Sequence, residues 1–448
     1  AETPRSFRHH KKKITAISNL STDVKIRRSK YQQLEGYATF LVKIFPVANL
    51  NAYEKWLLYQ FAVMPAVHIS YRDSKRNLNL HELLGVPEKE LLKDFPEALN
   101  TLVELGWLKR YNYGFIVHHL IQEVILFIEG EQIANCESLI YYLGDRLDKS
   151  FVKGKISGLA MLPFVQRIYD LFEVVEHDNL GSLYNNAAVI YEDALGDYQQ
   201  SLNFSYRAMD IYKATGGEFE LSISYNSLAT TYRLLGDFDK ALEHGLQALQ
   251  IRQKYQENKL AYLGNTYQTL SIIYRKKGQL EKAIETALQA IEIRKKLSAH
   301  PERDKRIAKL YNNISIIYRS LGDYDQAIDY AERAVTMKEK YYPEDKISLS
   351  TSYSSLSVSC FEARKFEQGF AYALQDLEIS EAVLNANHPY LAATYSNIAH
   401  YYYYFKEYEQ ALFYNRKELK ILQSNFDANH PDFQQAKRLE ELILGRMQ

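Results

Sequence analysis

Two rows of hydrogen-bonding side chains recur at matched spacing in the second half of the chain. The amide row consists of Asn226, Gln268 and Asn312. The arginine row, whose side chains end in guanidinium groups, consists of Arg233, Arg275 and Arg319. Amides pair with peptide backbone, and guanidinium groups bind carboxylates through two parallel hydrogen bonds. The rows therefore predict a surface that binds a protein or peptide ligand. The alternative is that the arginines are solvated helix residues, repeated only because the segment around them was duplicated.

A repeated segment carries both rows. "TYRLLGDFDKALEHGLQAL" from Thr231 returns as "IYRKKGQLEKAIETALQAI" from Ile273 and "IYRSLGDYDQAIDYAERAV" from Ile317. Aligned tyrosines lie at intervals of 42, 44, 42 and 42 residues, at Tyr225, Tyr267, Tyr311, Tyr353 and Tyr395. Apolar and small residues three or four positions apart predict one helix face, and the Gly of "LGD" predicts its end. Each copy is thus predicted to be a helical hairpin that must stack on a neighbour to bury its apolar face.

This pattern resembles the tetratricopeptide repeat, which has an aromatic residue, a Leu, a small residue, a Tyr and a Gly-aromatic turn at these places. By this resemblance, six copies cover residues 180–426, and "HPDFQQAKRLEELILGRM" supplies a C-terminal capping helix within residues 427–448. The long period and "NANHPYLAATYSNIA" resemble the kinesin-light-chain subtype. The resemblance implies an α-solenoid, a superhelix whose first helices line a concave groove. Both rows are expected to face that groove.

The last two copies depart from the pattern. Cys360, Arg364 and Gly369 stand where other copies have a ring, the turn Gly and the small Ala, which predicts looser packing in the fifth copy. In the sixth copy, "AHYYYYFKEY" places four consecutive tyrosines around the whole helix. Tyr403 and Tyr404 are therefore expected to face the groove as aromatic anchors. The alternative is that these rings are buried against the capping helix.

Composition limits the function classes. The 448 residues carry 55 Lys plus Arg and 55 Asp plus Glu, so no overall charge favours nucleic acid or a membrane surface. The two cysteines lie far apart, which indicates neither a disulfide framework nor a zinc site, and a cytoplasmic location fits best. No apolar run reaches the roughly 18 to 20 residues that a membrane span needs. Without a catalytic motif or a metal-ligand cluster, we expect this chain not to be an enzyme and to hold no cofactor or metal.

The first third of the chain does not repeat. Residues 1–50 are predicted to be a basic tail followed by the remnant of a helical subdomain. Residues 51–130 predict three helices and a β-hairpin with its turn at Asn112 to Gly114, in the order of a winged-helix domain. Residues 131–179 predict amphipathic helices that link this domain to the repeats and cap them. The fold class expected for the whole chain is all-α: a winged helix with a small β-hairpin, followed by an α-solenoid.

The winged-helix region resembles the end of the nucleotide-binding module of STAND signalling ATPases, which include NB-ARC proteins. The stretches that carry the resemblance are "ANLNAYEKWLLYQFAVMP", "ALNTLVELGWLKR" and "GFIVHHLIQEV". It implies a winged helix that closes over ADP or ATP and a phosphate contact from His118 in "VHHL", which an imidazole can make. The Asp of the family motif is His119 here, so the motif is incomplete. The alternative is that His118 is an ordinary residue at the hairpin edge.

No GxxxxGK[ST] loop occurs in the sequence, so the chain lacks the usual cradle for a triphosphate. By the resemblance, ADP or ATP is expected in an upstream nucleotide-binding domain of a larger parent protein. This chain is then the sensor portion, in which the repeats bind a ligand and the winged helix controls nucleotide-dependent activation and homo-oligomerisation. Antiphage defence or a similar immune signalling pathway is the setting that the family implies.

Two alternatives stay open. One is a freestanding adaptor that bridges partners through the groove. The other is a transcription regulator whose winged helix binds DNA, but residues 51–130 hold 8 Lys plus Arg against 10 Asp plus Glu. Because DNA binding needs a basic excess to neutralise phosphates, nucleic acid is not the expected partner.

Overall fold

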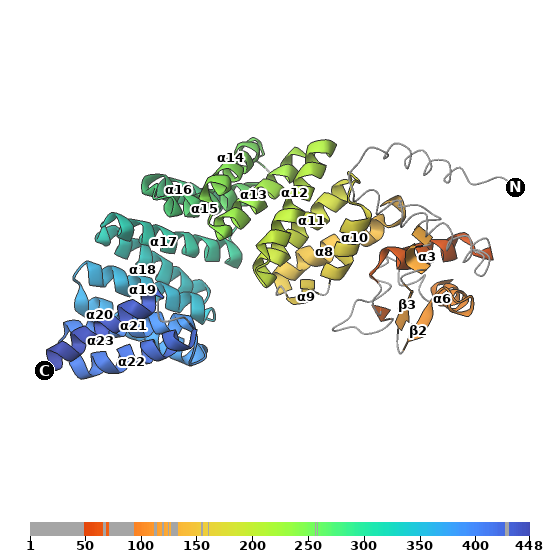
Figure 1. Cartoon of the computed structure of the whole chain (residues 1–448). Helices are drawn as coiled ribbons and strands as arrows, with labels where there is room; N and C mark the ends of the chain where they lie inside the picture. The colour runs from red at the N-terminus through yellow and green to blue at the C-terminus, as the bar shows by residue number, and fades with distance from the viewer. Residues whose placement is uncertain are drawn as a thin grey trace, which may run out of the picture. The chain divides into compact units, whose positions relative to one another are not determined.

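The computed structural model describes residues 49–65, 69–70, 94–111, 114–118, 121–123, 125–126, 133–153, 156–159, 161–255, 257, 259–425 and 430–448. This part of the chain is nearly all helical, and it divides into two compact units, Ala1–Leu235 and Gly236–Gln448 (Figure 1). The predicted tail over residues 1–48, the turn residues 112–113 and His119 lie outside the described residues. None of the helices in the described ranges has the length and apolarity that crossing a bilayer requires.

The first unit begins with two helices and three short strands. They are α3 (Ala52–Val63), β1 (Ile69–Ser70), α6 (Asp94–Glu104), β2 (Lys109–Tyr111) and β3 (Gly114–Ile116). The strands form one antiparallel sheet in the order β1-β3-β2, in which Phe115 pairs with both Ile69 and Arg110. The start of α3 is fixed by a reciprocal cap, because the backbone N–H groups of Asn51 and Glu54 each donate to the other's side chain, at 2.8 and 2.9 Å.

These N-terminal elements share a hydrophobic core with the first helical hairpin. Four segments connect them: η2 (Ile133–Asn135), α8 (Glu137–Lys153), α9 (Ile156–Leu159) and α10 (Leu162–Leu171). A single cluster of buried side chains extends from Leu50 to Tyr212. Within it, Gln122 donates from Nε2 to the carbonyl oxygens of Phe61 at 2.9 Å and Met64 at 2.8 Å. The first unit therefore packs as one body.

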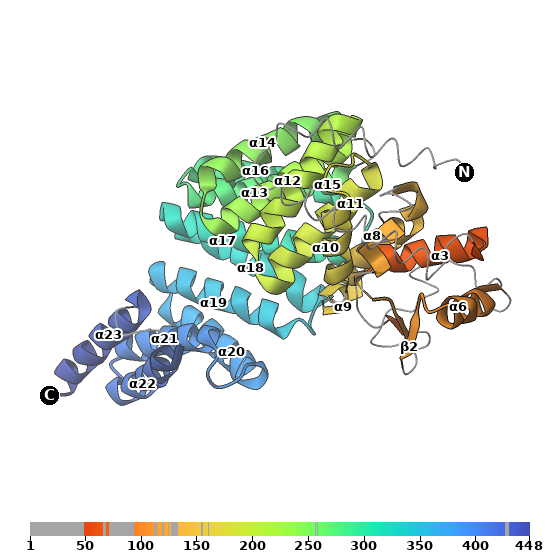
Figure 2. The ribbon, with the colours of Figure 1, turned by 45° about the vertical axis from the view of Figure 1, so that its right-hand side comes forward.

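The first unit ends with the first hairpin and one further helix. Its elements are α11 (Asp178–Ile190), the π-helical turn η3 (Tyr191–Leu195), α12 (Tyr198–Thr215) and α13 (Glu218–Leu235). Figures 1 and 2 show α8 and α10 alongside α11, which they contact. The two helices of the hairpin approach closely at Gly181, where an added Cβ would overlap the ring of Tyr212. The carboxylate of Asp197 caps α12 by accepting from the N–H of Gln200 at 3.0 Å.

The second unit consists of ten helices among its described residues. They are α14 (Phe238–Lys254), α15 (Leu260–Lys276), α16 (Leu280–Lys295), α17 (Pro301–Leu321), α18 (Tyr324–Tyr341), α19 (Lys346–Glu362), α20 (Phe366–Val383), α21 (Pro389–Tyr404), α22 (Tyr408–Asn425) and α23 (Pro431–Met447). Consecutive helices pack as hairpins, and α23 covers α22 (Figure 2). The small residues predicted at the close approaches are fully buried: Ala241, Ala283, Ala327 and Ala411. Gly236 and Gly322 have φ of 81° and 78° at helix ends, as predicted from "LGD".

The expectation of looser packing in the fifth copy is wrong at Gly369. An added Cβ there would overlap the hydroxyl of Tyr401, which comes from the following copy. The missing side chain is thus replaced by a ring, and Tyr401 donates from its hydroxyl to the carbonyl of Ser357 at 2.7 Å. The turn that lacks its Gly keeps the left-handed conformation, with φ of 61° at Arg364.

Candidate functional site

The amide row consists of half-buried side chains on three first helices of the hairpins. Asn226 lies on α13 in the first unit, whereas Gln268 lies on α15 and Asn312 on α17 in the second. The Oδ1 atoms of Asn226 and Asn312 are buried, and within the described part of the chain no donor reaches either of them. Gln268 differs, because its Oε1 accepts a hydrogen bond of 3.0 Å from Arg294. Two members of the row therefore hold unused acceptors beneath the surface.

The arginine row is also half-buried rather than fully solvated. Burial lowers the pKa of Arg233, with the charge of Glu192 acting in the opposite direction. Burial likewise lowers the pKa of Arg319. The charge of Glu362 opposes this lowering, and the charge of Arg275 adds to it. The structure thus brings Arg275 and Arg319 close enough to repel one another, while Arg233 belongs to the other unit. Two adjacent guanidinium groups on neighbouring helices favour an anionic group between them.

Three buried cations form a further row that the sequence analysis did not identify. They are Arg252, Arg294 and Lys338, which lie near the ends of α14, α16 and α18 at intervals of 42 and 44 residues. All three are buried, with exposed fractions of 2%, 2% and 4%. Burial lowers their pKa values to about 10, about 10 and about 8. The signal in the sequence was a basic residue at the same register in three successive copies. Polarity alone predicts such residues at the surface.

The first and third of these cations bind the following helix through neutral oxygens. Arg252 donates from Nη1 to the carbonyl of Tyr262 at 3.0 Å and to Oγ1 of Thr266 at 2.6 Å. Lys338 makes the equivalent pair of bonds on α19, to the carbonyl of Ser348 and to Oγ of Ser352, both at 2.6 Å. Each cation therefore ties the end of one hairpin to the start of the next.

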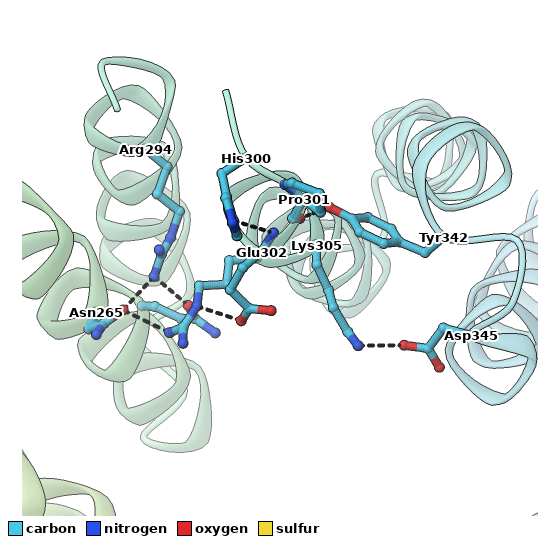
Figure 3. Close-up of polar contacts among 10 residues, drawn as sticks. Asn265, Arg294, His300, Pro301, Glu302, Lys305, Tyr342 and Asp345 are labelled. Carbon is cyan, nitrogen blue, oxygen red and sulfur yellow. Dashed lines mark hydrogen bonds and ion pairs between the residues drawn. The ribbon is translucent and has the colours of Figure 1, made fainter. Parts of the chain in front are cut away.

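Arg294 is directed elsewhere. Its Nη2 donates to Oδ1 of Asn265 at 2.8 Å and to Oε1 of Gln268 at 3.0 Å, both on α15 of its own hairpin. Arg306, on α17, donates from Nη1 to the same Oδ1 of Asn265 at 2.9 Å and from Nε to Glu302 at 3.0 Å. Figure 3 shows Arg294 reaching Asn265, with Glu302 nearby on the helix that begins at Pro301. Two guanidinium groups thus share one neutral acceptor.

The start of α17, beside this group, is held firmly. His300 accepts at Nδ1 from the N–H of Glu302 at 3.2 Å and caps the helix. Lys305 pairs with Asp345 at 2.9 Å, and the hydroxyl of Tyr342 donates to the carbonyl of Pro301 (Figure 3). The position of Arg306 is therefore set by the fold, since its helix is anchored on both sides.

The four consecutive tyrosines have separate environments. Tyr401 is buried in the core, and Tyr402 stacks on Tyr414 with ring centroids 5.7 Å apart. Tyr403 packs against a cluster that contains residues of α23, which is the alternative of burial against the capping helix. Tyr404 is 48% exposed and stacks on Phe366 at a centroid distance of 3.5 Å. Of the two predicted anchors, Tyr404 is exposed and Tyr403 is half-buried.

His118 lies at the other end of the chain and is exposed. Its carbonyl accepts from the N–H of Gln122 at 3.1 Å, while the preceding Val117 is buried in the core. The backbone around His118 is thereby fixed. Within the described residues, no group of His, Cys, Asp and Glu side chains is arranged to hold a metal ion.

Comparison with known proteins identifies the repeats. Tetratricopeptide-repeat models match residues 220–296, 348–424 and 308–341. These segments are therefore tetratricopeptide repeats, as the sequence predicted, and repeats of this kind indicate protein–protein interaction. No curated protein sequence matches the chain.

Two solved structures share the fold over most of the chain. One is a signal transduction ATPase with numerous domains (STAND) protein with a tetratricopeptide repeat sensor from Pyrococcus horikoshii, at 18% identity and a TM-score of 0.52, over 88% of this chain and 60% of that one. The other is the apo form of the quorum sensor NprR from B. thuringiensis, at 15% identity and a TM-score of 0.50, over 81% of this chain and 99% of that one. This chain therefore spans about 60% of the length of the STAND protein.

Proposed function

We propose that this chain is the sensor and regulatory portion of a STAND signalling ATPase, and that its repeats bind a protein or peptide ligand. The observation that carries the proposal is the similarity to the STAND protein with a tetratricopeptide repeat sensor. This similarity extends over 88% of the chain, so it includes the non-repeating N-terminal part together with the repeats. The chain itself is proposed to carry no enzymatic activity, and its parent to bind ADP or ATP.

The ligand surface is proposed to be formed by the amide and arginine rows, of which Asn226 and Arg233 belong to the first unit and the remaining members to the second. The unused buried acceptors of Asn226 and Asn312 suit the N–H groups of a bound peptide backbone. The adjacent charges of Arg275 and Arg319 suit a carboxylate. Tyr404 adds an exposed ring that an apolar side chain can cover. These features favour a protein or peptide over nucleic acid.

The N-terminal part is proposed to be a winged helix that controls activation. The order of α3, β1, α6 and the β2–β3 hairpin supports this, since a winged helix has helices followed by a hairpin. His118, next to β3, is the proposed contact to a nucleotide phosphate. Closure over the nucleotide would hold the parent protein inactive, and release would permit oligomerisation, in antiphage defence or related immune signalling.

Direct contacts offer a route between the repeats and this N-terminal part. Arg167 on α10 pairs with Glu123 at 3.2 Å and lies 3.4 Å from the carbonyl of Ala62 at the end of α3. On the other side, Asn186 of α11 donates to the carbonyl of Gly144 at 3.1 Å. Because these groups belong to one packed body, a shift of α11 is expected to displace α8 and, through the shared core, α3.

The first experiment selects ligands from a display library of random dodecapeptides and follows backbone hydrogen exchange with the best peptide bound. We expect protection on the repeat helices and a changed exchange rate over α3 and the β2–β3 hairpin. Protection confined to the peptide contacts would support the adaptor alternative instead, and the absence of any enriched peptide would contradict the proposal.

A second experiment tests the nucleotide contact in the native full-length protein. His118→Ala is expected to lower the ADP retained through purification or to cause activation without ligand, because a phosphate contact is lost. His177→Ala serves as the matched control, since His177 is the N-cap residue of α11 and is not a proposed nucleotide contact. Unchanged nucleotide retention and unchanged activation would sink the assignment of His118.

A further inference from the structure

The side chains of Asn265 and Gln268 are held in one fixed orientation. They stand three residues apart on α15 and so lie on the same face of that helix. The buried guanidinium of Arg294 binds the carbonyl oxygen of each, at 2.8 and 3.0 Å. Because Arg294 engages the oxygen of each amide, the group of each that is left to bind a ligand is its NH2, which donates. The pair therefore presents donors rather than acceptors.

The charge around this pair is unbalanced. Arg294 and Arg306 converge on the single neutral oxygen of Asn265, and burial and then the charge of Arg306 lower the pKa of Arg294 to about 10. The nearby Glu302 opposes this shift, but its side chain is 56% exposed and its partner Arg306 is 40% exposed. An exposed ion pair of this kind contributes little. Nε of Arg294 is buried, and nothing in the described part of the chain accepts from it.

The arrangement occurs in only one of the aligned copies. The residues that correspond to Asn265 in the other copies are Ile223, Lys309, Thr351 and Ala393. In the neighbouring hairpins, moreover, Arg252 and Lys338 bind the following helix instead of a groove amide. A ligand that binds Asn265, Gln268 and Arg306 can therefore do so in only one of the aligned repeats.

We propose that Asn265, Gln268 and Arg306 form a subsite for one carboxylate of the bound peptide, with Arg294 as the residue that positions the two amides. The carboxylate accepts from the NH2 groups of both amides and from Arg306, taking the place of the weak partner Glu302. It neutralises the excess positive charge at the same time. The subsite rests on the proposed function, and it narrows the ligand to a peptide with an acidic residue at one defined position.

Stability of the free protein gives a test that needs no ligand. Asn265→Asp keeps the shape of the side chain and builds the missing negative charge between the two guanidinium groups. We expect it to raise Tm at pH 7 by about 2–4 °C. The two guanidinium groups should lower the folded pKa of this aspartate, so the gain should be complete above about pH 4 and be lost as the pH falls below that value. The matched control is Asn312→Asp, which places a carboxylate at a half-buried amide whose Oδ1 accepts from no donor in the described part of the chain, and which should lower Tm.

Binding gives the second test. Peptides selected from the random dodecapeptide library by the wild-type protein should share an Asp or Glu at one position. Replacing that residue by Asn or Gln should weaken binding about tenfold to the wild type. For the protein variants Asn265→Asp and Arg306→Gln, the same peptide replacement should weaken binding less than about twofold, because the subsite is already lost. For Arg306→Lys, which keeps the charge, it should weaken binding about tenfold, as for the wild type.

The outcomes separate the two claims. Enriched peptides without a shared acidic position would overturn the subsite but leave the peptide-binding function standing. No enriched peptide at all would contradict both. A fall in Tm for Asn265→Asp equal to that for Asn312→Asp would overturn the subsite whatever the selection yields, because it would mean that no excess positive charge exists there.

Discussion

The ring of Tyr401 fills the space that Gly369 leaves open between α20 and α21. Its hydroxyl donates to the carbonyl of Ser357, so the contact joins the fifth copy to the sixth. The ring of Phe361 lies against it edge-on, with centroids 5.1 Å apart. Two departures from the repeat pattern, a missing methyl group and an extra ring, thus compensate one another.

Gly369→Ala should destabilise the second unit, because the added methyl group must displace a packed ring. We expect a loss of about 1–3 kcal/mol, the usual cost of overpacking, measured by chemical denaturation. Gly445→Ala is the matched control, since no atom in the described part of the chain lies within 4 Å of a Cβ at that helical position. It should gain up to about 1 kcal/mol through helix propensity. Equal effects of the two changes would contradict the interlocking described here.

Gln268→Ala and Asn312→Ala should differ although both shorten an amide at the same register. The first removes an acceptor from buried Arg294, which we expect to cost about 1–3 kcal/mol. The second removes an oxygen without a donor in the described residues, so it should cost about 1 kcal/mol less. Thermal unfolding of both variants checks this. Equal losses would mean that the Arg294 contact contributes nothing to stability.

Glu418 should make the stability of the last hairpin depend on pH. Burial, opposed by hydrogen bonds from Ser396 and Asn415, raises the pKa of Glu418 from 4.5 to about 7. A raised pKa means that the folded state holds the proton more tightly than the unfolded chain does. The stabilisation is therefore complete below about pH 4.5 and is lost as the pH rises through about 7.

Glu418→Gln mimics the protonated form and should remove this dependence. We expect it to be more stable than the wild type at pH 8, by at most on the order of 3 kcal/mol, and equally stable at pH 4.5. The measurement is the free energy of unfolding across that range, and the other titrating groups cancel in the difference between the two proteins. A difference that does not change with pH would show that folding does not raise the pKa of Glu418.

The sequence predicted the helical hairpins because their pattern recurs five times in register. Spacing of apolar residues, the "LGD" turns and the small Ala positions each have a local physical cause, and the structure places helix ends and buried alanines accordingly. Compensation between copies was not predictable in this way. Gly369 was recognised as a departure, but its partner Tyr401 lies 32 positions away and belongs to another copy.

The site was predicted less completely than the fold. Arg294 went unrecognised because hydrophobic patterning assigns a basic residue near a helix end to solvent, whereas the structure buries it beneath two amides. The tyrosine run gave no means of choosing among its rings, since four consecutive residues cover the whole circumference of a helix. Only packing separates exposed Tyr404 from Tyr403, which contacts the cluster with α23.

The central claim is that the arginine row binds the peptide, and one affinity measurement tests it most directly. The best peptide from the library is titrated calorimetrically into the wild type, into a triple variant (Arg233→Glu, Arg275→Glu and Arg319→Glu) and into a control with the same change in charge (Lys213→Glu, Lys296→Glu and Lys420→Glu). The control lysines are exposed and lie on second helices or just beyond one. If the row binds the peptide, the triple variant should lose at least about a hundredfold in affinity, and the control should lose less than about threefold. The helical circular dichroism of the triple variant should be unchanged. Equal affinity in the triple variant and the control would contradict the claim.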